Sequence, residues 1–89
     1  MDYLHYDMQL EGDDLVEVDL DKQANIRLLD PVNFSQYKRG AHYTYYGGVA
    51  KLAPFTLRPP HPGRWHLVID MGRYPGTVHA NVRKLKDVN

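Results

Sequence analysis

Apolar and polar residues alternate along residues 64–71, which read Arg-Trp-His-Leu-Val-Ile-Asp-Met. One side of this segment carries Trp65, Leu67, Ile69 and Met71, and the other carries Arg64, His66, Val68 and Asp70. Alternation with period two, bounded by a glycine at each end, is typical of a strand with one buried face. The segment also holds the only tryptophan of the chain, whose ring offers a core a large apolar surface. We therefore expect the other strands to pack onto it.

Three further strands are predicted before this segment, over residues 3–10, 15–21 and 24–29. Each alternates apolar and polar residues, and the core-facing residues are Leu4, Tyr6, Met8, Leu10, Val16, Val18, Leu20, Ala24, Ile26 and Leu28. The intervening residues 11–14 and 21–23 favour turns, because glycine gives the backbone freedom and aspartate side chains close local hydrogen bonds.

The one helical segment that the pattern allows lies at residues 32–39, as a short helical turn or a compact loop. It follows Asp30-Pro31, where proline ends the strand pattern because it cannot donate a ladder hydrogen bond. Gly40 is well placed to end a helix. Phe34 and Tyr37 lie three residues apart, and we expect them to cover one end of the core.

Extended but irregular chain is predicted over the next stretch. Residues 41–46 are rich in β-prone residues, and Gly47-Gly48 permits a bulge or a sharp bend. Residues 49–57 fit an edge strand because a proline interrupts them. Residues 58–63, Arg-Pro-Pro-His-Pro-Gly, favour a stiff polyproline-like connector into the tryptophan strand.

A last strand is predicted over residues 77–84, with Val78, Ala80 and Val82 facing the core. We expect it to form a hairpin with residues 64–71. Because directly opposite residues face the same side of a sheet, the connecting loop has four residues, 72–75 or 73–76. This pairing would place on one outer face the residues Arg64, His66, Asp70, His79, Asn81 and Arg83.

Seven candidate strands joined by short turns favour an all-β fold, either a small antiparallel β-sandwich or a partly closed barrel. Residues 1–89 are expected to form a single domain, with residues 85–89 as a polar tail. A chain of this length buries about 60–65% of the surface that its unfolded form exposes, which is enough for one small core.

The composition narrows the chemistry and the compartment. The chain has no cysteine, which excludes disulfides and thiolate catalysis. Its first residues include Asp2 and Asp7, where a secretory signal needs basic residues followed by an apolar run. No apolar run is long enough to span a membrane. We therefore expect a bacterial protein of the cytoplasm.

The formal net charge is zero, but the charges are unevenly distributed. Residues 1–21 contain eight acidic residues and no lysine or arginine, whereas residues 22–89 contain all eleven basic residues and three acidic ones. One interpretation is that acidic strands lie beside basic strands and neutralise them within the domain. The other is a dipolar surface that favours a homodimer or places a basic face before an anionic ligand.

The sequence contains no catalytic motif. The single serine, Ser35, lacks the flanking glycines of a nucleophile elbow, and there is no phosphate-binding glycine loop and no His-Glu-x-x-His zinc motif. His66, Asp70 and His79 would suit zinc or iron if the predicted hairpin brings them together. Nothing in their spacing is diagnostic, and the alternative is a set of solvent-facing polar residues. We therefore assign no metal and no cofactor.

Aromatic and basic residues interleave from Tyr37 to Tyr46. Aromatic platforms in a basic groove bind single-stranded nucleic acid. The zero net charge argues against a strong phosphate-binding surface, so nucleic acid is not the expected ligand. Sugar binding by Tyr43, Tyr45 and Tyr46 stays open.

A resemblance is carried by residues 12–18 (Gly-Asp-Asp-Leu-Val-Glu-Val), 24–30 (Ala-Asn-Ile-Arg-Leu-Leu-Asp) with Asn33-Phe34, 45–48 (Tyr-Tyr-Gly-Gly) and 62–66 (Pro-Gly-Arg-Trp-His). Together these segments resemble a bacterial family of small domains, the domain-of-unknown-function family numbered 1883. The resemblance covers nearly the whole chain and implies a small, mostly β domain. It also implies a sensing or interaction role, since relatives occur joined to Toll/interleukin-receptor-type domains. It supplies no catalytic residues.

The sequence thus favours a binding or interaction module, related to sensing or signalling, whose partner is a protein or a small molecule; a membrane partner is not expected. We expect its ligand site on the outer face that carries Arg64, His66, Asp70, His79, Asn81 and Arg83. The second candidate is the tyrosine segment with Tyr43, Tyr45 and Tyr46. Two alternatives stay open: a small metal-dependent or hydrolytic enzyme that uses His66, Asp70 and His79, and a self-associating structural protein.

Overall fold

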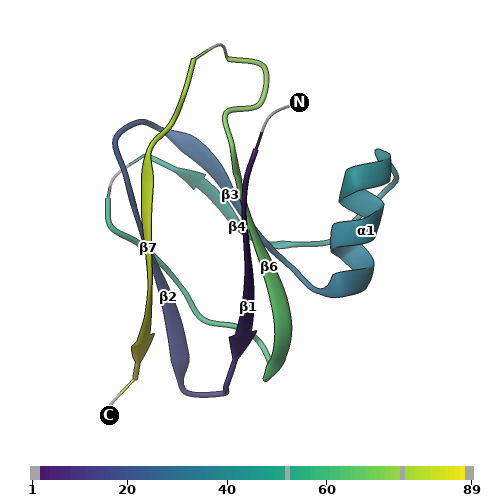
Figure 1. Ribbon diagram of the computed structural model, residues 1–89, viewed down its shortest axis with the longest axis vertical. Helices are drawn as coiled ribbons and strands as arrows, with labels where there is room; N and C mark the ends of the chain where they lie inside the picture. The colour runs from purple at the N-terminus through teal and green to yellow at the C-terminus, as the bar shows by residue number, and fades with distance from the viewer. Residues whose placement is uncertain (1–2, 52, 75, 88–89) are drawn as a thin grey trace.

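The computed structural model describes residues 3–51, 53–74 and 76–87, and shows two antiparallel sheets with one helix beside them (Figure 1). The chain forms β1 (Leu4–Leu10), β2 (Asp14–Leu20), β3 (Ala24–Leu29), α1 (Pro31–Arg39), β4 (Tyr46–Ala50), β5 (Phe55–Leu57), β6 (Gly63–Asp70) and β7 (Ala80–Lys86). The predicted all-β fold is confirmed. Within the described residues the two sheets form a sandwich-like arrangement and do not close into a barrel.

The tryptophan strand β6 lies inside the larger sheet, whose strand order is β1-β6-β3-β4. It pairs with β1 on one side, where Met8 lies opposite Trp65, and with β3 on the other, where Leu28 lies opposite Leu67. A paired strand on each side helps to bury β6, as it does β3. The prediction that other strands pack onto this one is confirmed for β1 and β3, and Trp65 lies in the core between the sheets.

The predicted hairpin between the tryptophan strand and the last strand is wrong. β7 belongs to the smaller sheet, whose order is β5-β2-β7, and its Arg83 lies opposite Glu17 of β2. Both edges of β6 are already taken by β1 and β3, so the chain crosses to the other sheet after β6. Parity determines which side each residue faces, but it does not determine which strand lies next to it.

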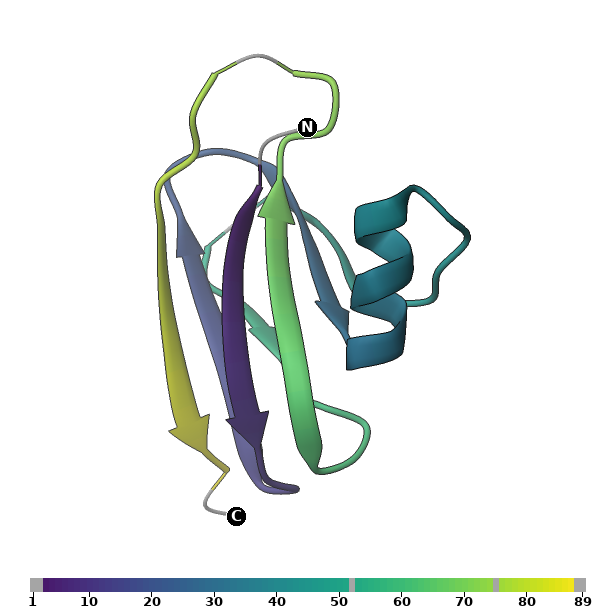
Figure 2. The ribbon, with the colours of Figure 1, turned by 45° about the vertical axis from the view of Figure 1, so that its right-hand side comes forward.

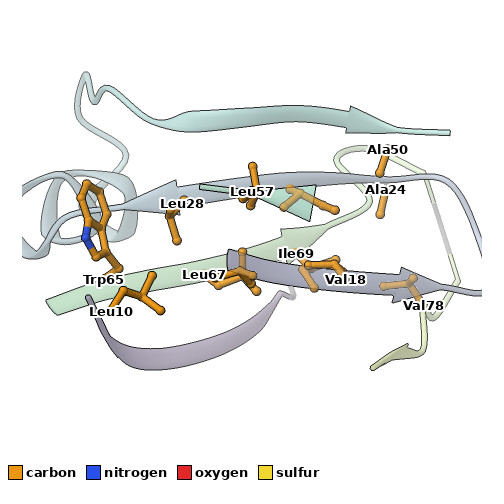
Figure 3. Close-up of a cluster of buried hydrophobic side chains, with 12 residues drawn as sticks. Leu10, Val18, Ala24, Leu28, Ala50, Leu57, Trp65, Leu67, Ile69 and Val78 are labelled. Carbon is orange, nitrogen blue, oxygen red and sulfur yellow. The ribbon is translucent and has the colours of Figure 1, made fainter. Parts of the chain in front are cut away.

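The core lies between the two sheets and is formed largely by residues that alternation placed inward, together with Ala50 and Leu57 from the predicted irregular stretch. It contains Leu10, Val16, Val18, Ala24, Ile26, Leu28, Ala50, Leu57, Trp65, Leu67, Ile69 and Val78. Figure 3 shows that the Trp65 ring lies at one end of this cluster and that Val78 lies at the other. Burial of apolar surface on this scale is the dominant favourable contribution to folding.

The helix α1 is longer than the predicted single turn. Asp30 precedes it, and its Oδ1 accepts a hydrogen bond from the backbone N–H of Asn33 at 2.8 Å. This arrangement caps the helix, and Pro31 in the first turn suits the helical backbone. Gly40 ends the helix in the left-handed region, at φ 73°, where glycine is favoured.

The predicted position of the helix residues is corrected. Phe34 does not cover an end of the main core but packs with Leu29 and Val68 in a separate cluster on the outer face of the larger sheet. Tyr37 packs against the same cluster. Figure 2 shows α1 beside the larger sheet, on the side away from β7. The helix therefore buries the outer face of β3 and β6.

Four smaller predictions also change. Residues 41–45 are not in a strand, and Gly47 and Gly48 lie within β4 instead of forming a bend. The predicted edge strand over residues 49–57 is divided, because β4 belongs to the larger sheet and β5 to the smaller one. The strand β7 extends to Lys86, so the first residues of the expected polar tail belong to a sheet.

The charge asymmetry of the sequence is neutralised in part within the domain. Of the six ion pairs between described residues, four join the acidic first 21 residues to the basic remainder: Arg64–Asp7, Arg83–Glu17, Lys86–Asp13 and Lys86–Asp14. The acidic strand β2 lies beside the basic strand β7, which is the first of the two interpretations of the sequence. Because most of these side chains are exposed, each pair contributes little to stability.

Candidate binding surface beside the helix

The candidate site lies on the outer face of the larger sheet, where the strands β1, β6 and β3 pass beneath α1. The registers place His5 opposite Val68 and Val68 opposite Arg27, and they place Asp70 opposite Asn25. Most of these outward positions carry polar side chains, while the opposite faces of the three strands are apolar and face the core. The helix covers Val68 through Phe34 and Tyr37, whereas Arg64 at the other end of β6 stays exposed.

Asp70 is the centre of this site, because its carboxylate is buried and fully hydrogen-bonded. Only 2% of the residue is exposed. Its Oδ1 accepts hydrogen bonds from Asn25 Nδ2 at 3.0 Å and from the backbone N–H of Gly72 at 2.9 Å. Its Oδ2 accepts from the Arg27 guanidinium and from the Tyr37 hydroxyl, the latter at 3.0 Å. A buried carboxylate needs such partners, since burial of an unpaired charge is very costly.

The Asp70 carboxylate fixes the positions of Arg27 and Tyr37. The guanidinium pairs with a carboxylate that is 1% exposed at the side chain, and it therefore has a fixed and strongly bound orientation. Burial raises the pKa of the Tyr37 hydroxyl well above its usual value, and the hydrogen bond to Asp70 raises this pKa further. Tyr37 thus stays a neutral donor throughout the physiological range.

Tyrosine rings surround Arg27. Its Cζ atom lies 5.4 Å from the Tyr45 ring centroid and 5.8 Å from that of Tyr37. Tyr37 in turn contacts Tyr3 and Tyr43 edge-on, with ring centroids 5.4 Å and 5.3 Å apart. We call Tyr3, Arg27, Tyr37, Tyr43 and Tyr45 the tyrosine–arginine surface. Tyr45 is 43% exposed and Tyr3 is 36% exposed, so this surface is open to a partner.

A second cluster of rings lies beside this surface. Phe34 stacks on both His5 and His66, with ring centroids 4.3 Å apart in each case. His5 Nε2 and His66 Nδ1 are 2.8 Å apart. Burial lowers the pKa of His66, and the positive groups nearby lower it further, while Asp7 opposes them. Two histidines that share one hydrogen bond require at least one neutral ring.

The structure brings together some of the predicted site residues. Asp70, His66 and Arg64 share the outer face of β6, and Tyr43 and Tyr45 belong to the tyrosine–arginine surface. Arg64 is exposed and pairs with Asp7 at 3.0 Å. Tyr46 faces the other way and contacts Trp65 edge-on, with ring centroids 5.9 Å apart.

The other predicted site residues lie on the smaller sheet, so the expected shared face does not exist. Arg83 pairs with Glu17, Asn81 lies opposite Asp19, and the backbone N–H of His79 donates to Asp21 Oδ1 at 2.8 Å. His66, Asp70 and His79 are therefore not brought together. In the part of the chain that the structure describes, no three His, Cys, Asp or Glu side chains are placed to hold a metal ion.

Arg27, Tyr37, Tyr3 and His5 are site residues that sequence reasoning did not identify as such. The pattern does contain one signal, because Asp70 and Arg27 are charged residues at outward positions of predicted strands. Alternation shows that both side chains point outward from their strands. It does not show that their strands are neighbours, which is what places the carboxylate against the guanidinium.

A cavity of about 400 Å³ opens beside Tyr3, at the end of the sandwich where β6 leads into its following loop. Its lining includes Tyr3, Ile69, Asp70, Tyr74 and Val78. Both oxygens of Asp70 are already engaged by donors of the protein. The cavity can therefore accept an apolar or aromatic group, but it offers no free carboxylate for chemistry.

These features define a small all-β domain of two antiparallel sheets, with a helix and a fixed tyrosine–arginine surface on one outer face. The chain belongs to a family described as "Domain of unknown function (DUF1883)", which matches residues 1–88. The predicted resemblance is thereby confirmed. No curated protein and no solved structure matches the chain. No helix among the described residues is long and apolar enough to cross a membrane.

Proposed function

We propose that this domain is a binding module that recognises a protein partner through the tyrosine–arginine surface, in a sensing or signalling role within the bacterial cytoplasm. One observation carries the proposal: the buried Asp70 carboxylate holds Arg27 and Tyr37 in place, while Tyr45 and Tyr3 remain exposed beside them. The cytoplasm suits a chain without cysteine, because such a chain needs no oxidising compartment.

Tyrosine and arginine are the residue types that most often carry the binding energy of protein interfaces. A tyrosine offers a large contact area at a small cost in conformational entropy. Here the rings and the guanidinium already contact one another, so these side chains lose little further conformational entropy when a partner binds. Such preorganisation raises affinity.

The test is a pull-down from the native cell with three forms of the domain as bait. We expect one partner to be retained by the wild type and lost from Tyr45→Ala, because this change removes an exposed ring of the surface. Val32→Ala is the control, since Val32 is 70% exposed on α1 and lies outside the surface. Equal retention of every protein by the wild type and Tyr45→Ala would contradict the proposal.

A thermal-shift screen against metals, nucleotides, simple sugars and short single-stranded oligonucleotides tests the other ligand classes. A ligand that binds only the folded state stabilises it by about 2.7 kcal/mol at a hundred times its dissociation constant. A sugar that stabilises the wild type but not Tyr45→Ala would replace the protein partner by a carbohydrate. Stabilisation by zinc or iron would support the metal-dependent enzyme instead, with metal ligands other than the set His66, Asp70 and His79.

A further inference from the structure

We propose that the free edge of β4 binds an extended segment of a partner protein, which adds a strand to the larger sheet. The inference rests on the proposed role in protein binding and states the form of the partner. Strand addition at a sheet edge uses main-chain hydrogen bonds for affinity and alternate side chains for specificity. An exposed edge accepts such a strand unless the protein guards it.

Of the four sheet edges in the described part of the chain, three are guarded. The edge strand β1 carries Asp7, and Lys84 of β7 reaches its backbone at the Gln9 carbonyl, 3.4 Å away. The edge strand β7 carries Arg83, Lys84 and Lys86. The edge strand β5 has only three residues and lies between prolines. Charged residues, prolines and shortness are the usual protections of an edge.

The edge of β4 has none of these protections. Its sequence, Tyr-Gly-Gly-Val-Ala, contains neither a charge nor a proline, and no described strand pairs with its outer side. Tyr46 is 51% exposed and Val49 is 50% exposed. Apolar side chains are therefore available beside the free main-chain groups.

The two glycines leave room for the side chains of an added strand. Gly47 lies opposite Arg27 on the outer face, and Gly48 lies opposite Ile26 on the core face. Neither face of β4 carries a side chain there, while Val49 and Tyr46 flank the gaps. Large side chains of a neighbouring strand pack well over such glycines.

The charges around this edge favour a partner segment with an acidic residue. Lys22 and Lys51 line a hollow next to Ala50, together with Asp21. The hollow has a net positive charge, because its two lysines outnumber the single Asp21 carboxylate. A carboxylate at one end of the added strand would pair with Lys51.

A second copy of the chain does not meet this requirement. Residues 43–53 contain no acidic residue, so β4 of one copy paired with β4 of another would leave Lys51 without a carboxylate. The shared edge would also be only about 17 Å long, and two rigid domains that meet there bury less than the roughly 800 Å² per partner of a stable interface. A flexible segment instead follows the edge and fills both glycine gaps.

The experiment selects binders from a displayed library of random peptides of about 12 residues, long enough to cover the strand and its flanks. The best peptide is then synthesised, and its Kd is measured by fluorescence anisotropy. We expect selected peptides to alternate large apolar residues and to carry Asp or Glu near one end. Methylation of alternate backbone nitrogens of the peptide should abolish binding, because it removes main-chain donors.

Val49→Lys tests the site, because it places a charge on the edge, and it should weaken binding by about tenfold or more. Val32→Lys is the matched control: Val32 is 70% exposed on α1, and the same change there should leave the Kd unaltered. Gly48→Ala is a second edge variant: a Cβ at Gly48 meets no atom within 4 Å, so the domain can accept it, and the methyl group partly fills the gap that the added strand would use. It should therefore also weaken binding.

Three outcomes would overturn the inference: no enriched peptide, peptides that bind Val49→Lys as tightly as the wild type, or a concentration-dependent dimer that Val49→Lys dissolves. The last would make a second copy the occupant. Failure here is distinct from failure of the proposed function. A native partner that depends on Tyr45 but binds Val49→Lys normally would retain the tyrosine–arginine surface and reject strand addition.

Discussion

At the scale of single residues, the outer face of the larger sheet is organised by one buried charge. The Asp70 carboxylate accepts four hydrogen bonds from Asn25, Gly72, Arg27 and Tyr37. A buried ion pair is not by itself a strong source of stability, because desolvation offsets its attraction. Here the carboxylate of Asp70 instead fixes the positions of the Arg27 guanidinium and the Tyr37 hydroxyl within the tyrosine–arginine surface.

Asp70→Asn should destabilise the domain by about 3 kcal/mol, because it leaves the Arg27 guanidinium without its counter-charge in a mostly buried place. Chemical denaturation measures the free energy of unfolding. The matched control is Asp7→Asn, which breaks the exposed pair with Arg64 and should cost less than about 1 kcal/mol. Equal costs for the two variants would contradict the central role of Asp70.

His66 should make the domain less stable as the pH falls below 6.5. Burial lowers the folded-state pKa of His66 below its ordinary value of 6.5, so the unfolded chain takes up this proton first. Stability is therefore complete above pH 6.5 and decreases as the pH falls toward the folded-state pKa. The lowered pKa values of Asp14 and Asp21 act in a separate window, below their ordinary 3.8.

Titration of the imidazole signals by NMR tests this prediction directly. The pKa of His66 should lie below 6.5, and Lys38→Met should raise it, because Lys38 is one of the cations that lower it. A His66 pKa at or above 6.5 in the wild type would show that Phe34 does not shield the ring from water.

At the scale of elements, two adjacent glycines of β4 differ in whether the fold can accept a side chain in their place. Gly47 has a φ of 137°, and a Cβ there would lie 2.2 Å from the Ile26 carbonyl oxygen. The same atom at Gly48 would meet nothing within 4 Å. The close approach of β4 to β3 therefore requires glycine at one position only, and the free edge remains open at the other.

Gly47→Ala should destabilise the domain by about 2 kcal/mol or more, because the new methyl group forces β4 away from β3 and the backbone into strain. Gly48→Ala should change stability by less than about 0.5 kcal/mol. Thermal unfolding of the two variants gives the comparison. Similar melting temperatures would show that β4 is not held closely against β3.

At the scale of the whole molecule, the two sheets divide the chemistry of the chain. The smaller sheet pairs acidic β2 with basic β7 and so neutralises much of the charge asymmetry. The larger sheet carries the helix, the tyrosine–arginine surface and the unguarded edge of β4. Both proposed binding features therefore lie on the same sheet, with Tyr45 directly before β4.

Local signals in the sequence determined most of the strands and the position of the helix. The tryptophan strand, the three strands before it, the inward residues of the last strand and the position of the helix all follow from period-two and glycine–proline signals, because side-chain direction is a local property of the backbone. The pairing of the last strand did not follow, since many arrangements satisfy the same parity.

The candidate site depended on what alternation leaves open. Asp70, His66, Tyr43 and Tyr45 were named from the sequence, but His79, Asn81 and Arg83 were assigned to the same face through a hairpin that does not form. Arg27 and Tyr37 meet Asp70 only because β3 lies beside β6 and α1 packs over both. The sequence determined which side chains face outward, whereas the tertiary structure decided which of them meet, because contacts between distant segments depend on the order of strands in the sheets.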